Sequence, residues 1–302
     1  MERMMRAIDL FAGWGAFTLG ATKAGVDVVW AADHWKLAVE AHRQNHPDTK
    51  HECQDLNQCD FSQVPDYEIL LASPACQGHS TASQPKRRSF HDDLRATAWA
   101  VISCADRTNP EIVIVENVPS FKRWKQYSAW VGALELLGYC VHEVQSTASG
   151  HGVPQRRKRL FIVATRSGTP PRLEPGPEPA FGPCVQWGEG EWRPVSEATP
   201  NVRRRVDVAR ARHGDRFLTQ HVTGHKGVGL YEPIRTITTA DQWAVVDRDM
   251  YRPLTVRESA RAMGFPDLYS WPPGATRTDT IRGIGNAVCP PQGAAIIEAA
   301  VI

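Results

Sequence analysis

A cysteine and a glutamate follow two successive apolar runs of the sequence, where reactive side chains are common. Cys76 comes after "EILLASPA", and Glu116 comes after "EIVIV". Burying a carboxyl group directly after an apolar run costs free energy unless the group is hydrogen-bonded, so such a residue often takes part in chemistry. A thiol and a carboxyl group at adjacent strand ends would suit addition to an electrophilic ring. Alternatively, Cys76 is a buried structural thiol and Glu116 ties neighbouring loops together through backbone N–H groups.

A glycine turn and two carboxylates point to a second ligand. In "DLFAGWGAF" (9–17), Gly13 and Gly15 permit a tight turn and a close approach to the backbone. Asp33 ends the next apolar run and Asp55 follows the short element "HECQD", which are positions where acids bind ribose hydroxyls or amines. This pattern predicts an adenosine-containing ligand. Asp33 could instead be a helix N-cap, and the missing third glycine of G-x-G-x-x-G disfavours a nicotinamide oxidoreductase.

The elements that must position these residues alternate along the first 165 residues. Helix-like stretches are expected at about 16–24, 35–45, 93–107 and 124–137. The strand candidates between them are "RAIDLF", "VDVVWAAD", "YEILLAS", "EIVIVEN", "YCVHEVQST" and "RLFIVAT". This alternation predicts an α/β fold with a mostly parallel sheet and helices on both faces. Ligands bind at the carboxyl ends of the strands in such sheets.

The composition of the sequence changes after Ser167, where Pro and Gly become frequent. We predict a catalytic and cofactor-binding domain at 1–166, a small irregular domain at 167–250, and a segment at 251–302 that completes the first domain. In "LTVRESARAMGFPD", Thr255 and Glu258 have the spacing of a capping box at a helix start. "GIGNAV" predicts a glycine turn before a terminal helix.

Composition excludes several classes of protein. The 302 residues are 42% hydrophobic with a formal charge of +2, and no run approaches the roughly 20 apolar residues of a membrane span. The start of the chain lacks signal-peptide architecture, so we expect a cytoplasmic enzyme. Seven cysteines without a C-x-x-C pair argue against a zinc site or a disulfide framework, so no metal is expected.

Six segments in order and spacing resemble the cytosine-5 DNA methyltransferases of bacteria and phages. They are "DLFAGWGAF", "SPACQGHS", "VENVPSF", "QRRKRLF", "LTVRESARAMGFPD" and "GIGNAV", and the likeness covers the chain except for about 170–230. The resemblance implies a Rossmann-like fold that binds S-adenosylmethionine, with a small target-recognition domain. It also implies methyl transfer to carbon 5 of cytosine in a short duplex sequence, after the base has been flipped out of the helix.

The resemblance assigns roles to individual residues. Cys76 would add to carbon 6 of cytosine, and Glu116 would hydrogen-bond ring nitrogen 3 and the exocyclic amine. Arg159, with Arg157 and Gln155, would bind the base oxygen and stabilise the thiolate. Nearby cations lower the pKa of a thiol. The implied cofactor residues are Phe11, Gly13, Gly15, Asp33, Asp55 and Asn286. The implied substrate-binding residues are Pro74, Gln77, Ser80, Asn117 and Gln155.

Basic clusters suggest how double-stranded DNA is held. Residues 151–250 carry 16 Lys or Arg against 11 Asp or Glu. The polar stretch 78–93 is predicted to close over flipped DNA, with Lys86, Arg87 and Arg88 on phosphates, although it could be a plain solvated loop. We expect the enzyme to be monomeric. The candidates for contacts to the DNA bases are Arg203, Arg204, Arg205, Arg210, Arg212, Gln220, His221, His225 and Lys226.

The sequence departs from the family pattern at three positions. Ala75 stands where the family has proline, His79 where an aromatic residue is usual, and Ala16 where a second glycine is usual. Two alternatives remain open: an RNA cytosine-5 methyltransferase and a catalytically silent DNA-binding homologue. The lack of a "CFT"-type motif disfavours the first. Retention of Cys76 and Glu116 together disfavours the second.

Overall fold

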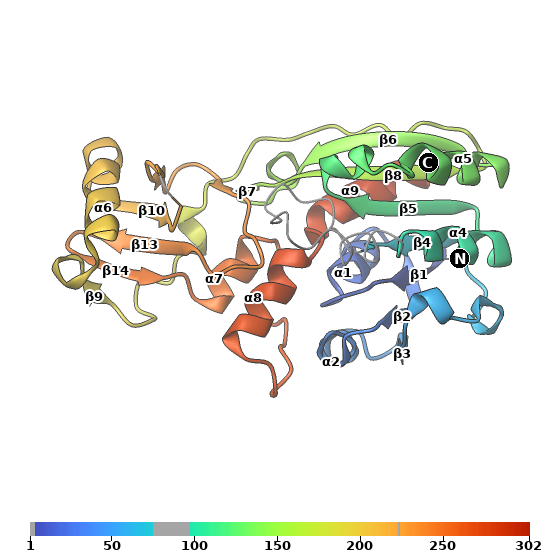
Figure 1. The fold of residues 1–302 in the computed structure, drawn as a ribbon, viewed down its shortest axis with the longest axis horizontal. Helices are drawn as coiled ribbons and strands as arrows, with labels where there is room; N and C mark the ends of the chain where they lie inside the picture. Colours follow the sequence, from blue (N-terminus) through green and yellow to red (C-terminus); the bar gives the residue numbers. More distant parts are fainter. Residues whose placement is uncertain (1–3, 75–96, 223) are drawn as a thin grey trace.

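The computed structural model describes residues 4–74, 97–222 and 224–302. Figure 1 shows a large sheet with helices on both faces at one end of the molecule and a smaller antiparallel sheet at the other. Helices α7 (Val256–Arg261) and α8 (Arg277–Asn286) lie between the two sheets (Figure 1). These two helices therefore form part of the junction between the two sheets.

The large sheet has seven strands in the order β3-β2-β1-β4-β5-β8-β6. Strands β1 to β5 are parallel, whereas β8 runs antiparallel between β5 and β6. Each predicted strand is present, so the predicted α/β fold is confirmed. The strands are β1 (Arg6–Leu10), β2 (Asp27–Asp33), β3 (Lys50–Cys53), β4 (Ile69–Ala72), β5 (Ile112–Asn117), β6 (Cys140–Thr147) and β8 (Lys158–Thr165).

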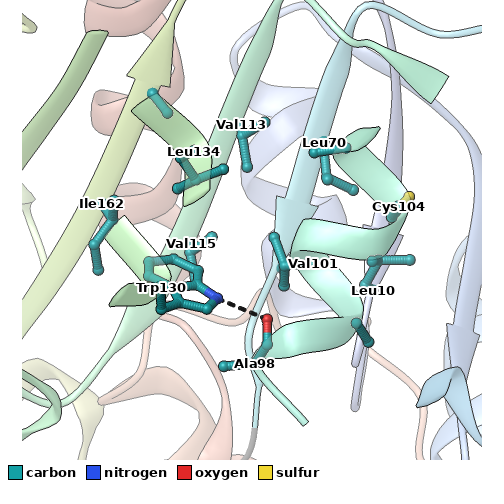
Figure 2. Packing of buried hydrophobic residues seen from close by; sticks show 14 of the residues in the cluster. Leu10, Leu70, Ala98, Val101, Cys104, Val113, Val115, Trp130, Leu134 and Ile162 are labelled. Carbon is teal, nitrogen blue, oxygen red and sulfur yellow. Dashed lines mark hydrogen bonds between the residues drawn. The ribbon is translucent and has the colours of Figure 1, made fainter. Parts of the chain in front are cut away.

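Two apolar clusters cover the two faces of this sheet, because successive strand residues point to opposite sides. On one face, α4 (Trp99–Thr108) and α5 (Tyr127–Leu136) pack on alternate residues of β1, β4, β5 and β8. Figure 2 shows this packing, with the Trp130 indole donating to the Ala98 carbonyl at 2.8 Å. On the other face, α1 (Ala16–Lys23) and α9 (Pro290–Ala300) cover the remaining strand residues.

The other helices complete the connections around the large sheet. Helix α2 (Lys36–Asn45) links β2 to β3, and α4 corresponds to the helix expected at 93–107, of which residues 93–96 lie outside the described residues. The short 3-10 helices are η1 (Leu56–Gln58), η2 (Phe61–Gln63), η4 (Pro119–Arg123), η5 (Ala148–His151), η6 (Gly182–Cys184) and η7 (Val195–Glu197).

The small sheet is antiparallel throughout, in the order β11-β10-β13-β14-β9. Helix α6 (Pro200–His213) packs on one face through Val202, Val206 and Ala209, and residues of 181–192 pack near the other. The sheet reaches Pro253, three residues past the predicted boundary at 250, and the domain division itself stays a prediction. Its strands are β9 (Arg193–Pro194), β10 (Arg216–Gln220), β11 (Val228–Gly229), β13 (Trp243–Asp247) and β14 (Met250–Pro253).

A strand ladder and a buried ion pair are among the connections between the bodies. A two-strand ladder pairs β7 (Gln155–Arg156) with β12 (Ile234–Arg235) in parallel. Arg252 of β14 forms a fully buried ion pair with Glu258 of α7, with 2.8 Å between Nη2 and Oε1. The predicted capping box of Thr255 and Glu258 at the start of α7 is confirmed.

The prediction of a glycine turn at "GIGNAV" is wrong. Thr276 and Asp279 form a second capping box, and the helix that they start, α8, continues through Gly283 and Gly285 to Asn286. Glycine normally weakens a helix interior, but here the missing side chains let other segments approach the helix closely. The terminal helix α9 was predicted and begins at Pro290.

Candidate active site

The carboxyl end of β5 brings Glu116 together with Arg159. Because β5 and β8 are antiparallel, Glu116 lies opposite Phe161, and the Arg159 side chain returns to the same strand end. Arg159 Nε lies 2.8 Å from Glu116 Oε1, and the two side chains are only 11% and 8% exposed. Burial raises the pKa of Glu116, and the charges of Arg159 and Arg157 oppose that rise. A carboxyl group poised in this way can accept or donate a hydrogen bond at the edge of a ring.

Asn117 fixes the backbone that leads to the predicted nucleophile. Its side chain is buried, and its Nδ2 donates to the Pro74 carbonyl at 3.1 Å, while its Oδ1 accepts from the Val118 amide at 2.9 Å. The end of β5 is therefore tied to the segment after β4. Cys76, Gln77 and Ser80 lie outside the described residues, as do Ala75 and His79.

Arg157 and Gln155 bond to the backbone of neighbouring segments. Arg157 is 1% exposed, and its Nη atoms donate to the carbonyls of Ile237, Gly285 and Ala287 at 2.9 Å each. Gln155 Oε1 accepts from the Ile237 amide at 2.7 Å, and its Nε2 donates to the Ala262 carbonyl. These two side chains hold the loop after β12 and the end of α8 against the strand that carries Arg159.

The predicted cofactor loop follows β1 and is braced by Asp33. Phe11, Gly13 and Gly15 have φ values of 58°, 52° and 78°, in the left-handed region that glycine tolerates best. Asp33 Oδ2 accepts from the Gly13 amide at 3.0 Å, and its Oδ1 accepts from the Trp35 amide at 2.8 Å. Asp33 thus shapes the turn and also supports the start of α2.

The other two predicted cofactor residues lie on the surface at strand and helix ends. Asp55 is exposed after β3, and its Oδ1 accepts from the amide of Asn57 at 3.0 Å. Asn286 is exposed and is the last residue of α8. Both side chains can therefore meet a ligand without prior unfolding.

Trp14 is a functional neighbour that sequence reasoning missed. It is buried in the middle of the cofactor loop, and a Cβ atom built on Gly283 would lie 0.7 Å from its Nε1. The Trp14 ring centroid lies 5.2 Å from that of Trp35 and 6.1 Å from that of Trp271. The signal was available, since a glycine inside an amphipathic helix often marks close packing. Helix α8 therefore supports the cofactor loop directly.

A buried polar chain lies beneath the same loop. Thr18 donates to Asp9 Oδ2 at 2.8 Å and contacts His42 Nε2 at 2.9 Å, while His42 Nδ1 lies 2.8 Å from His51 Nε2. Burial raises the pKa of Asp9 to about 7 and lowers the pKa of His42 well below its usual range. Burial also lowers the pKa of His51 to about 4. Near neutral pH the two histidines are therefore uncharged, whereas Asp9 gains and loses its proton in this range.

The predicted DNA-binding arginines lie on α6, at the end of the molecule away from the large sheet (Figure 1). Arg203 and Arg204 are exposed, and the charge of Arg205 contributes to the lowered pKa of both His221 and His225. His225 itself is buried, and its Nδ1 accepts from the amides of Gln220 and Gly227. Lys86, Arg87 and Arg88 lie outside the described residues.

Neither a membrane-spanning helix nor a metal cluster is found in the described parts of the chain. Across residues 4–74, 97–222 and 224–302, the helices are too short or too polar to cross a bilayer. Within the same ranges, His, Cys, Asp and Glu side chains form no group that could hold a metal ion.

Comparison with known proteins places the chain in a family. The model of the C-5 cytosine-specific DNA methylases matches residues 5–202 and 191–301. Type II methyltransferase M.NlaX of Neisseria lactamica is 27% identical, with 98% of this chain and 96% of the relative covered. Type II methyltransferase M.HhaI of Haemophilus parahaemolyticus is 24% identical, over 94% and 90% of the two chains.

Solved structures share the fold at lower identity. The structure of DNMT2 from Spodoptera frugiperda has a TM-score of 0.72 and 16% identity, with coverage of 99% of this chain and 100% of that one. The family match decides between the activities that the sequence left open, and it favours DNA over RNA and an enzyme over a silent homologue. The chain belongs to the C-5 cytosine-specific DNA methylases and is an S-adenosylmethionine-dependent DNA cytosine-5 methyltransferase.

Proposed function

We propose that the enzyme methylates cytosine in double-stranded DNA through a covalent adduct of Cys76, with Glu116 and Arg159 holding the flipped base. The observation that supports this proposal is the buried pair of Glu116 and Arg159 at the carboxyl end of β5. Asn117 fastens this strand end to Pro74, two residues before Cys76 in the sequence. The other proposed substrate-site residues are Gln77 and Ser80.

Each residue has a chemical task in this proposal. Addition of the Cys76 thiolate to carbon 6 makes carbon 5 nucleophilic, because the ring becomes enamine-like. Glu116 hydrogen-bonds ring nitrogen 3 and the exocyclic amine, where charge changes during addition. Burial raises the pKa of Glu116, so protonation, which would let this carboxyl group donate to nitrogen 3, costs less free energy than for an exposed glutamate. After carbon 5 has taken up the methyl group, loss of its proton to a base and expulsion of the thiolate complete the turnover.

The groups around the β1 turn fit an adenosyl cofactor. Two carboxylates, Asp33 and Asp55, lie at the carboxyl ends of the adjacent parallel strands β2 and β3, beside the turn of Gly13 and Gly15. Such an edge suits ribose hydroxyls and an adenine amine. Asn286 would close the site from α8. When bound, S-adenosylmethionine supplies an electrophilic methyl group on a sulfonium.

Arg157 and Gln155 are positioning residues in this proposal. Their side chains bond to the backbone of Ile237 and, in the case of Arg157, of Gly285. They set the loop after β12 against the strand that carries Arg159. Lys86, Arg87 and Arg88 are proposed to contact phosphates. A monomeric state and a cytoplasmic location in a bacterial or phage-infected cell also remain our proposals.

The test is methylation of mixed-sequence duplex DNA with S-adenosylmethionine, read by bisulfite sequencing. Cys76→Ser should abolish protection of cytosines, and Glu116→Gln should reduce it strongly. The matched controls are Cys140→Ser, at an exposed cysteine on β6, and Glu111→Gln, at the opposite end of β5. Undiminished protection by Cys76→Ser would contradict the covalent mechanism. A parallel assay on RNA checks the substrate.

A further inference from the structure

One end of the small sheet is directed toward the large sheet, and it is formed by strands β10 and β13. Strand β10 ends at Gln220 and β13 begins at Trp243, and these two residues are paired in the ladder. Figure 1 shows this end of β10 and β13 directed toward the large sheet, opposite α6. The segment 236–242, which leads into Trp243, therefore lies at the end of the small sheet that is directed toward the large sheet.

The segment 236–242 is held in place by the machinery of the active site. The Ile237 amide and carbonyl bond to Gln155 and Arg157. A Cβ atom on Gly285 would lie 2.3 Å from the Thr238 backbone, so α8 touches this segment directly. Asp241 pairs with Arg277 of α8 at 2.8 Å. The segment is therefore fixed against the strand that carries Arg159 and against α8.

Two amide side chains meet at this end of the sheet. Gln220 Nε2 donates to Gln242 Oε1 at 3.3 Å. Within the described residues, Gln220 Oε1 and Gln242 Nε2 have no hydrogen-bond partner. Gln220 is 8% exposed and Gln242 is half-buried, whereas His221 and Asp241 beside them are exposed. The Gln220 oxygen is thus an acceptor atom, and the Gln242 nitrogen a donor atom, that remain available at this end of the sheet.

This pattern of acceptor and donor matches one base edge in the major groove. Adenine presents the N6 amino donor beside the N7 acceptor, and glutamine amides read that pair of groups. Guanine presents two acceptors there, which would face the Gln220 oxygen unfavourably. The hydrogen bond between the two glutamines also fixes their rotamers before DNA arrives, which lowers the entropic cost of recognition.

We propose that Gln220 and Gln242 act together as the reader of one A·T base pair in the recognised DNA sequence. The proposal rests on the DNA methyltransferase activity and assigns specificity to this glutamine pair rather than to the arginines of α6. It requires that the methylated sequence contains an A·T pair at a fixed distance from the target cytosine.

The test measures sequence preference rather than activity alone. The full-length enzyme methylates a duplex library with randomised positions around a cytosine, and sequencing gives the preferred site. Rates are then measured on the preferred duplex and on one with the A·T pair changed to G·C. We expect the wild-type kcat/KM to fall about 5- to 150-fold on that change. Gln242→Ala should remove most of this discrimination, so that its kcat/KM values on the two duplexes become similar.

Further variants separate reading from folding. Gln242→Glu replaces the free donor by an acceptor, so it should disfavour adenine while keeping the shape of the side chain. Arg204→Gln on α6 is the control and should leave the preference unchanged. A wild-type site without a fixed A·T pair, or an unchanged preference in Gln242→Ala, would overturn the proposal. Absence of methylation by the wild-type enzyme would overturn the activity as well, so the two failures are distinguishable.

Discussion

Replacement of Gly283 by alanine should damage the cofactor loop from the side of α8. The new Cβ would lie 0.7 Å from Trp14 Nε1, whereas non-bonded carbon and nitrogen atoms need about 3.5 Å. The indole would have to move by roughly 3 Å, yet Trp14 is 1% exposed and packs against Trp35 and Trp271. The loop that contains Gly13 must therefore shift with it.

The size of the effect follows from two opposing terms. Overpacking costs about 1–3 kcal/mol, and this contact belongs at the upper end because the surroundings of Trp14 are filled. Alanine returns up to about 1 kcal/mol of helix propensity. We therefore expect a net loss of about 2 kcal/mol and a fall in Tm of roughly 3 °C for a chain of 302 residues. Affinity for S-adenosylmethionine should fall at least tenfold, because the turn that Asp33 braces is displaced.

The assay combines thermal unfolding with titration calorimetry of S-adenosylmethionine binding. Gly132→Ala is the matched control, because Gly132 also lies inside a helix, α5, and a Cβ atom there meets nothing within 4 Å. That variant should be neutral or slightly stabilised and should bind the cofactor normally. If Gly283→Ala kept both its Tm and its cofactor affinity, the contact between α8 and Trp14 would not hold the loop, and the reasoning would be refuted.

Two further predictions concern buried charges. Glu258→Gln should cost about 3–5 kcal/mol in urea unfolding, because it leaves the Arg252 guanidinium buried without its counter-ion, and the double variant Arg252→Met/Glu258→Leu should recover part of that loss. A loss below 1 kcal/mol in the single variant would contradict this expectation. Burial raises the pKa of Asp9 from 3.8 to about 7, so the folded state binds this proton more tightly than the unfolded chain. Its stabilising contribution is complete below about pH 4 and is lost as pH rises through 7. The Tm of Asp9→Asn should therefore fall less between pH 6 and pH 8 than the Tm of the wild type. An equal fall in both proteins would contradict the raised pKa of Asp9.

Local patterns in the sequence predict much of the large sheet. Apolar, β-branched runs such as "EIVIVEN" form strands wherever they are buried on both faces, so the strands that carry Glu116 and Asp33 were predictable. The antiparallel direction of β8 was not, because strand direction depends on pairing between residues far apart in the chain. That direction is what returns Arg159 to the end of β5.

The errors and omissions have a common physical cause. Gly283 and Gly285 suggested a turn because glycine is a poor helix former, but tertiary contacts with Trp14 and the Thr238 backbone override that propensity. Gln242 was overlooked because it matters only through its contact with Gln220, 22 residues earlier. Periodicity and motif spacing report on one segment at a time, whereas these features depend on two segments meeting.

The packing of α1 against α9 has a consequence for the synthesis of the enzyme. Gly20 of α1 lies so close to α9 that a Cβ atom there would be 2.8 Å from the Pro290 carbonyl oxygen. About 270 residues separate these two contact points in the sequence. At 5–20 residues per second, a ribosome needs roughly 15–55 s to add them. Throughout that time the helix that follows the cofactor loop lacks its packing partner, so one face of α1 stays uncovered until α9 has emerged.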